Sequence, residues 1–137
     1  MVCVMTDFLI AFVAALLAMA VIDGLWLGLV ARSFYRRHLG PLMAERPNWA
    51  AAVAFYLLYV VGVTVFAALP GAEAESLTDA AWRGGLFGLV AYATYDLTNA
   101  ATLRGWPWIV VAIDMAWGAI LTAAIATAAT GAVLLLA

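Results

Sequence analysis

Four long apolar runs constrain this chain more than any other feature of its sequence. They cover residues 8–31, 50–69, 82–103 and 108–131. Each is about as long as the 20 residues that an α-helix needs to cross the hydrocarbon core of a bilayer. Pro47, Pro70 and Pro107 fall between the runs or at their edges, where a missing backbone N–H costs least. The sequence therefore predicts an all-α integral membrane protein, a single domain of residues 1–137 built as a compact bundle of four transmembrane helices.

The composition agrees with a lipid environment and excludes other classes of protein. Hydrophobic residues make up 69% of the chain and charged residues 10%, which is far from the composition of a water-soluble domain. The 6 basic residues are too few and too scattered to neutralise a nucleic-acid backbone, so we expect no nucleic-acid partner. The single cysteine, Cys3, leaves no intramolecular disulfide and no thiolate cluster. We expect no metal site, and the sequence leaves the cofactor open.

The arginines predict the orientation of the helices in the membrane. Five of them flank the first and third connecting segments: Arg32, Arg36, Arg37, Arg46 and Arg104. The second connecting segment instead carries Glu73, Glu75 and Asp79, with only Arg83 nearby. The positive-inside rule then places the first and third segments in the cytoplasm and both termini outside. We expect a multi-pass protein of the bacterial inner membrane, with Arg32, Arg36, Arg37 and Arg46 contacting lipid headgroups from a segment that lies along the membrane surface.

The first apolar run is expected to stay in the mature protein. It is too long for the apolar region of a signal peptide, and Asp7 stands where such a peptide carries basic residues. Met5 is as suitable a start as Met1, and no candidate site residue depends on the choice.

Three carboxylates lie inside the apolar runs: Asp23, Asp96 and Asp114. An acidic side chain at the middle of a membrane helix costs about 2.5–3.5 kcal/mol on insertion scales, so it normally faces the bundle interior. At a rise of about 1.5 Å per residue, each lies roughly 10–13 Å from the cytoplasmic end of its helix. We therefore expect the three carboxylates in one layer that opens toward the cytoplasm. Because like charges at close range cannot all ionise, a proton or a cation should be shared among them.

Other polar and aromatic residues belong to the same predicted layer. Tyr92, Asp96 and Asn99 are spaced i, i+4, i+7 and share a face of the third helix. Trp26 and Trp117 each follow an aspartate by three residues, and we expect the two indoles to bracket the layer from opposite sides. The candidate intramembrane site consists of Asp23, Trp26, Tyr56, Tyr59, Tyr92, Asp96, Asn99, Asp114 and Trp117.

The residues leave several functions open. One is a small carrier or binding protein for a proton, a cation or an amphipathic solute, and its thinness favours a homodimer. Another is a membrane-embedded enzyme or accessory factor that acts on lipid, and a third is a structural or assembly subunit. The aspartates could also simply hold the bundle together through interhelical hydrogen bonds. Small residues such as Gly84, Gly88 and Gly118 favour close helix packing over a site.

Several segments of the chain also resemble a known family. They are VIDGLWLGLVARSFYRRHLG, LMAERPNW, FYLLYVVG, GLFGLVAYATYDLTNAATLRGWPW and DMAWG. Together they resemble the bacterial family catalogued as domain of unknown function 2177, which is described as a predicted membrane protein. The resemblance covers nearly the whole chain, is most specific at YDLTN and at the two Asp-x-x-Trp segments, and shows no departure at Asp23, Asp96, Asn99 or Asp114. It implies the four-helix membrane fold and no particular chemistry.

Overall fold

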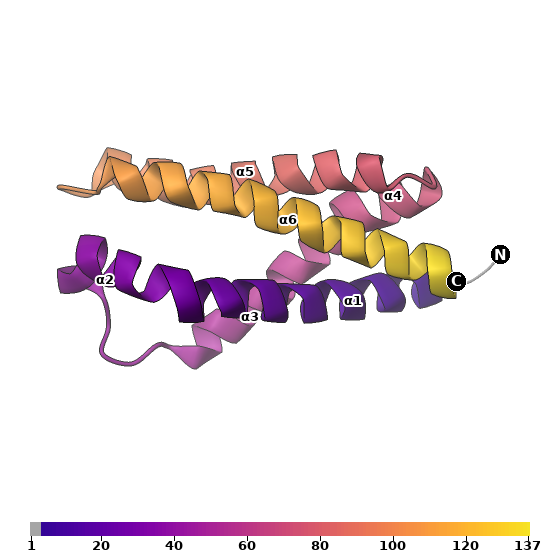
Figure 1. The fold of residues 1–137 in the computed structure, drawn as a ribbon, viewed down its shortest axis with the longest axis horizontal. Helices are drawn as coiled ribbons and strands as arrows, with labels where there is room; N and C mark the ends of the chain where they lie inside the picture. Colours follow the sequence, from indigo (N-terminus) through magenta and orange to yellow (C-terminus); the bar gives the residue numbers. More distant parts are fainter. Residues whose placement is uncertain (1–3) are drawn as a thin grey trace.

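The computed structural model describes residues 4–137, and the described chain is helical with short connections. Cys3 and the alternative start at Met1 lie outside the described residues. Figure 1 shows a paired α5 and α6, with α1 beside α6 and with α3 running obliquely across them. The beginning of α1 and the end of α6 lie at one end of the bundle, together with the connection from α4 to α5.

The first helical run is longer than its apolar stretch. It joins α1 (Val4–Leu25), the π-helical segment η1 (Trp26–Ala31), α2 (Arg32–Leu39) and the 3-10 turn η2 (Gly40–Leu42). These 39 residues continue well past the predicted end at residue 31, because arginine is a good helix former and no breaker occurs before Gly40 and Pro41. The arginine-rich segment is therefore an extension of the first helix and lies beside the end of α5 and the beginning of α6 (Figure 1).

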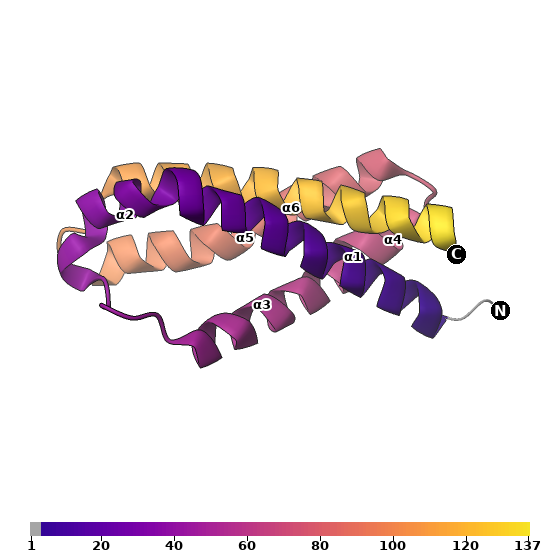
Figure 2. The ribbon, with the colours of Figure 1, turned by 60° about the horizontal axis from the view of Figure 1, so that its bottom comes forward.

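The second run also continues beyond its predicted end. It comprises α3 (Trp49–Val63), the π-helical segment η3 (Thr64–Ala68) and α4 (Leu69–Glu73). Asn48 begins it by accepting a hydrogen bond from the Ala51 amide at 3.1 Å. Pro70 was expected to end the helix, but it lies in the first turn of α4, where the wider π segment before it makes room for the ring. The first half of α3 diverges from the other helices (Figure 2).

The other two helices, α5 (Leu77–Thr102) and α6 (Trp108–Leu136), pack closely along their length (Figures 1 and 2). Their contact depends on glycine. A Cβ added at Gly88 would lie 2.0 Å from the Gly118 carbonyl oxygen, and one added at Gly84 would lie 2.6 Å from the Thr122 carbonyl oxygen. The small-residue ridges of the sequence therefore serve packing within the chain, as such spacing does in membrane helices.

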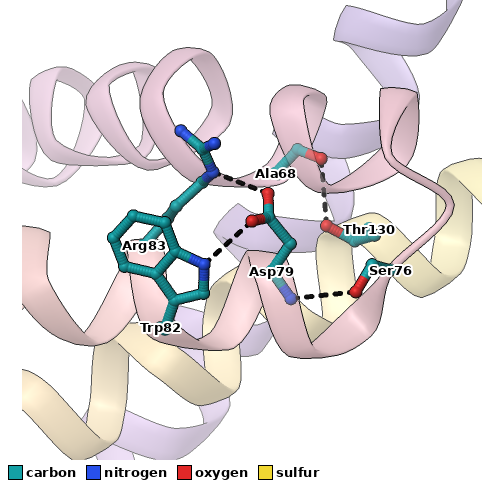
Figure 3. Close-up of polar contacts among 6 residues, drawn as sticks. All are labelled: Ala68, Ser76, Asp79, Trp82, Arg83 and Thr130. Carbon is teal, nitrogen blue, oxygen red and sulfur yellow. Dashed lines mark hydrogen bonds and ion pairs between the residues drawn. The ribbon is translucent and has the colours of Figure 1, made fainter.

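Hydrogen bonds and an ion pair stabilise the beginning of α5 (Figure 3). Ser76 accepts a hydrogen bond from the Asp79 amide at 3.1 Å and caps the helix. The Asp79 carboxylate binds Arg83 Nε at 2.6 Å and Trp82 Nε1 at 2.8 Å. The bond from Arg83, followed by the bond from Trp82, holds the pKa of this carboxyl below its usual value. Nearby, Thr130 donates to the Ala68 carbonyl oxygen at 3.0 Å and ties α6 to η3.

The outside of the bundle is apolar on nearly every helix. Three of its helical runs are long and apolar enough to cross a membrane: Val4–Leu42, Trp49–Glu73 and Trp108–Leu136. Helix α5 has 26 residues and runs beside α6, but it is less apolar than the other three and does not meet the same criterion. The fourth crossing therefore stays a prediction, as does the side of the membrane on which the termini lie.

Candidate functional site

Asp96 and Asp114 form a carboxyl pair between α5 and α6. Asp96 is fully buried, and neither of its oxygens has a hydrogen-bond partner among residues 4–137. Asp114 lies beside it, is 6% exposed and accepts a hydrogen bond from the Tyr35 hydroxyl. Two carboxyls in such surroundings cannot both carry a charge unless a proton or a cation lies between them. The pair is thus suited to holding a positive group.

Asp23 has quite different surroundings. Its Oδ2 accepts a hydrogen bond from the Tyr56 hydroxyl, and its Oδ1 accepts one from Trp117 Nε1 at 3.4 Å. These bonds connect α1 with α3 and α6, so Asp23 has the partners that a structural carboxyl in a membrane protein needs.

The two indoles of the Asp-x-x-Trp segments do not bracket the layer. Trp26 and Trp117 stack on each other, with ring centroids 4.3 Å apart and an interplanar angle of 12°. The reason is the register of α6, which brings Trp117 rather than Asp114 to the level of Asp23. Because α1 and α6 are antiparallel, Asp114 then lies about one helical turn closer to the connection at residues 103–107. The carboxyls therefore occupy two levels.

The remaining predicted residues surround these two levels. The Tyr59 hydroxyl lies 2.7 Å from Thr122 Oγ1, which itself donates to the Gly118 carbonyl oxygen. Tyr92 is half-buried, and its ring packs edge-on to Tyr59 with centroids 6.4 Å apart. Asn99 is half-buried beside Tyr95, and the structure records no hydrogen bond between its side chain and Asp96 within residues 4–137.

Sequence reasoning missed two residues of the site, Tyr35 and Trp106. Tyr35 was assigned to a surface segment, but the buried residues of the first helix follow a spacing of four, at Ala11, Ala15, Met19 and Asp23. Continuing that spacing passes the exposed Leu27 and reaches the buried Ala31 and then Tyr35, so the signal that could have found Tyr35 is a first helix that continues past residue 31. Trp106, in the short connection before α6, lies buried beside Asp96.

Unpartnered donors accompany the unpartnered carboxyl. The Nε1 atoms of Trp26 and Trp106 are buried and have no hydrogen-bond partner in the part of the chain that the structure describes. Trp106 approaches Asp96, and Trp26 approaches Tyr35. A buried donor without a partner costs about 1–3 kcal/mol, so this region is built for more contacts than the chain itself makes.

Two cavities adjoin Asp114, one member of the carboxyl pair. One, of about 300 Å³, lies between the first helical run and the α5–α6 pair, with Asp23, Trp26 and Trp117 in its wall. The other, of about 330 Å³, lies between α3 and α5, with Phe55, Tyr59 and Ala91 in its wall. Three residues line both cavities: Tyr92, Tyr95 and Asp114. A single molecule could therefore contact Asp114 from either side.

Within residues 4–137, no group of three or more histidine, cysteine, aspartate or glutamate side chains lies close enough to hold a metal ion. Arg32, Arg36 and Arg37 are exposed on α2, and Arg46 is exposed in the following connection. Their contact with lipid headgroups stays a prediction.

Long apolar helices, an apolar outer surface and an interior carboxyl cluster define a multi-pass integral membrane protein. The chain belongs to the family described as predicted membrane protein (DUF2177), whose model matches residues 8–131. No curated protein and no solved structure matches the chain.

Proposed function

We propose that the protein is a small intramembrane binding protein or carrier that exchanges a proton for a cationic group at the pair of Asp96 and Asp114. One observation carries the proposal: Asp96 is fully buried, and both of its oxygens lack a partner among residues 4–137. Desolvating a polar group without a compensating bond is costly, and it is costlier still for a charged group. A carboxyl kept in that condition is better explained by a ligand than by packing.

The contrast with Asp23 argues against a purely structural role for the pair. Asp23 receives two hydrogen bonds from neighbouring helices, as expected of a residue that holds a bundle together. Asp96 receives none within the described chain, although the Trp106 indole and Asp114 lie beside it. The same fold therefore contains one satisfied and one unsatisfied carboxyl, and the unsatisfied one is the candidate for exchange.

The setting that we propose for this activity is a bacterial inner membrane. The arginines near the connection between α2 and α3 would lie in the cytoplasm and contact lipid headgroups, with both termini outside. The carboxyl pair would then open toward the cytoplasmic half of the bilayer. A bundle of four helices is small for a carrier, so we propose that the protein works as a homodimer.

Proton release tests the exchange directly. The purified protein in weakly buffered detergent solution at neutral pH is titrated with n-butylammonium chloride, and the released protons are counted. Wild type should release up to about one proton per chain, because one proton shared by the pair is displaced. Asp96→Asn should release almost none. Asp79→Asn, which changes a half-buried carboxylate at the beginning of α5, far from the pair, should behave as wild type.

Release from Asp96→Asn equal to that from wild type would contradict the proposal, because the proton would then come from elsewhere. Absence of release from wild type would also contradict it and would favour a structural or assembly subunit. Folding of each variant is checked by its melting temperature before the titration.

A further inference from the structure

The walls of the first cavity combine negative charge with aromatic faces. Asp23 and Asp114 lie in a wall that also contains Trp26, Trp117, Tyr92 and Tyr95. An ammonium group is attracted both by carboxylates and by the faces of tryptophan and tyrosine rings. Anionic groups would be repelled by the same wall. The chemistry of the cavity thus favours a cation with N–H donors over a bare proton or an anion.

The second cavity has a different character, because Asp114 is the one charged residue among those that line it. Phe55, Tyr59 and Ala91 form its walls between α3 and α5. The first half of α3 diverges from the other helices (Figure 2), and two side chains in the wall of this cavity, Phe55 and Tyr95, are exposed on the outside of the bundle. In a membrane these side chains meet lipid, so the cavity adjoins the hydrocarbon of the bilayer.

From this arrangement we infer that the ligand is a single-chain amphiphile with an ammonium head. The inference rests on the proposed function and names the class of ligand for the same site. The head occupies the aromatic and acidic cavity and donates to Asp114, the member of the pair that lines it, while the chain lies in the cavity between α3 and α5 and continues into the bilayer. Two cavities of about 300 Å³ each, which share the wall at Asp114, match the lower range of ligand pockets, about 300–1,000 Å³.

Two probes with the same head and different chains test the inference. The protein in lipid nanodiscs is titrated with n-butylammonium and with n-dodecylammonium, and the apparent affinity is taken from the rise in melting temperature. Ala91→Phe fills the wall of the second cavity. It should weaken dodecylammonium binding by about tenfold or more, because burial of several methylenes is lost, and should leave butylammonium binding unchanged. Leu97→Phe adds the same ring at an exposed position of α5 and should bind both probes as wild type does.

The possible outcomes separate this inference from the proposed function. Dodecylammonium binding to Ala91→Phe at wild-type strength would overturn the inference, and so would an equal loss for both probes, which would mean that the substitution disturbs the charged site. The proposed function fails as well if wild type binds neither probe, or if Asp96→Asn binds both probes as wild type does. Phe55→Ala, which removes part of the exposed wall, is the second variant if Ala91→Phe does not fold, and the same preferential loss of dodecylammonium is expected.

Discussion

Two buried aspartates of this chain differ in one physical property, the number of hydrogen bonds that their oxygens accept. Both Asp23 oxygens accept bonds from neighbouring helices, and neither Asp96 oxygen accepts one within residues 4–137. Removing a hydrogen-bond donor of Asp23 should therefore lower the free energy of unfolding. Replacing Asp96 by a neutral residue should instead remove the desolvation penalty of a buried carboxyl without partners.

Tyr56→Phe tests the structural role of Asp23. The change deletes the hydroxyl that donates to Asp23 and keeps the ring, so we expect a loss of about 1 kcal/mol in the free energy of unfolding. Reversible unfolding in mixed micelles measures it. Tyr92→Phe is the matched control, since no hydrogen bond of the Tyr92 hydroxyl is recorded within the described chain. Equal stabilities of the two variants would show that the bond to Asp23 contributes nothing.

The sequence predicted the aspartates of the site but not their neighbours Tyr35 and Trp106. An acidic residue in an apolar run is conspicuous because its insertion cost demands an explanation. Tyr35 was not predicted because it stands in an arginine-rich segment, and its contact with Asp114 depends on the first helix continuing past residue 31. The stacking of Trp26 on Trp117 depends on the register between α1 and α6, which spacing along one helix cannot supply.

At the scale of helices, the seam between α5 and α6 depends on residues without side chains. Gly84 and Gly88 bring α5 against backbone carbonyls of α6, and Gly118 leaves room for the Tyr92 ring, which would lie 2.3 Å from an added Cβ. The same seam holds Asp96 beside Asp114. Asp96 and Asp114 can therefore lie side by side only because the glycines let α5 and α6 approach closely.

Gly88→Ala should open this seam. Its Cβ would lie 2.0 Å from the Gly118 carbonyl oxygen and 2.4 Å from Thr122 Oγ1, so the helices must separate, at a cost of about 1–3 kcal/mol. The melting temperature in detergent should fall accordingly. Gly85→Ala is a matched control on the same helix, because its Cβ would meet the Ala119 carbonyl oxygen at 3.7 Å. A Gly88→Ala protein that melts together with Gly85→Ala would refute the packing described here.

The existence of the helices was predictable from hydropathy, and their ends were not. The fourth helix begins at Trp108 as predicted, but the first extends to Leu42 and the second passes Pro70 to Glu73. Hydropathy marks where lipid contact ends, whereas a helix continues until a breaker or a cap ends it. The π-helical segments η1 and η3 leave no pattern in an apolar sequence, because they arise from packing against neighbouring helices.

At the scale of the whole molecule, the ends of the bundle differ in charge. The arginine-bearing connection at residues 43–48 and the turn at 103–107 lie at one end, and the connection between α4 and α5 lies at the other (Figure 1). This difference between the ends is the feature on which the predicted orientation rests.

Cysteine labelling in intact cells tests the predicted orientation. In a Cys3→Ser background, a membrane-impermeant maleimide should label Ala74→Cys before lysis and Glu45→Cys only after lysis, because the positive-inside rule keeps the arginine-bearing end in the cytoplasm. Both positions are exposed at opposite ends of the bundle. Labelling in the reverse order would invert the topology, and labelling of both before lysis would remove one crossing.

If Asp96 serves binding rather than stability, its loss should not destabilise the protein, and the melting temperature of Asp96→Asn without any ligand measures this. We expect a melting temperature at least as high as that of wild type, since the variant replaces an ionisable carboxyl, which has no hydrogen-bond partner within residues 4–137, by a neutral group of the same shape. A clearly lower melting temperature would contradict it, because Asp96 would then hold the helices together as Asp23 does.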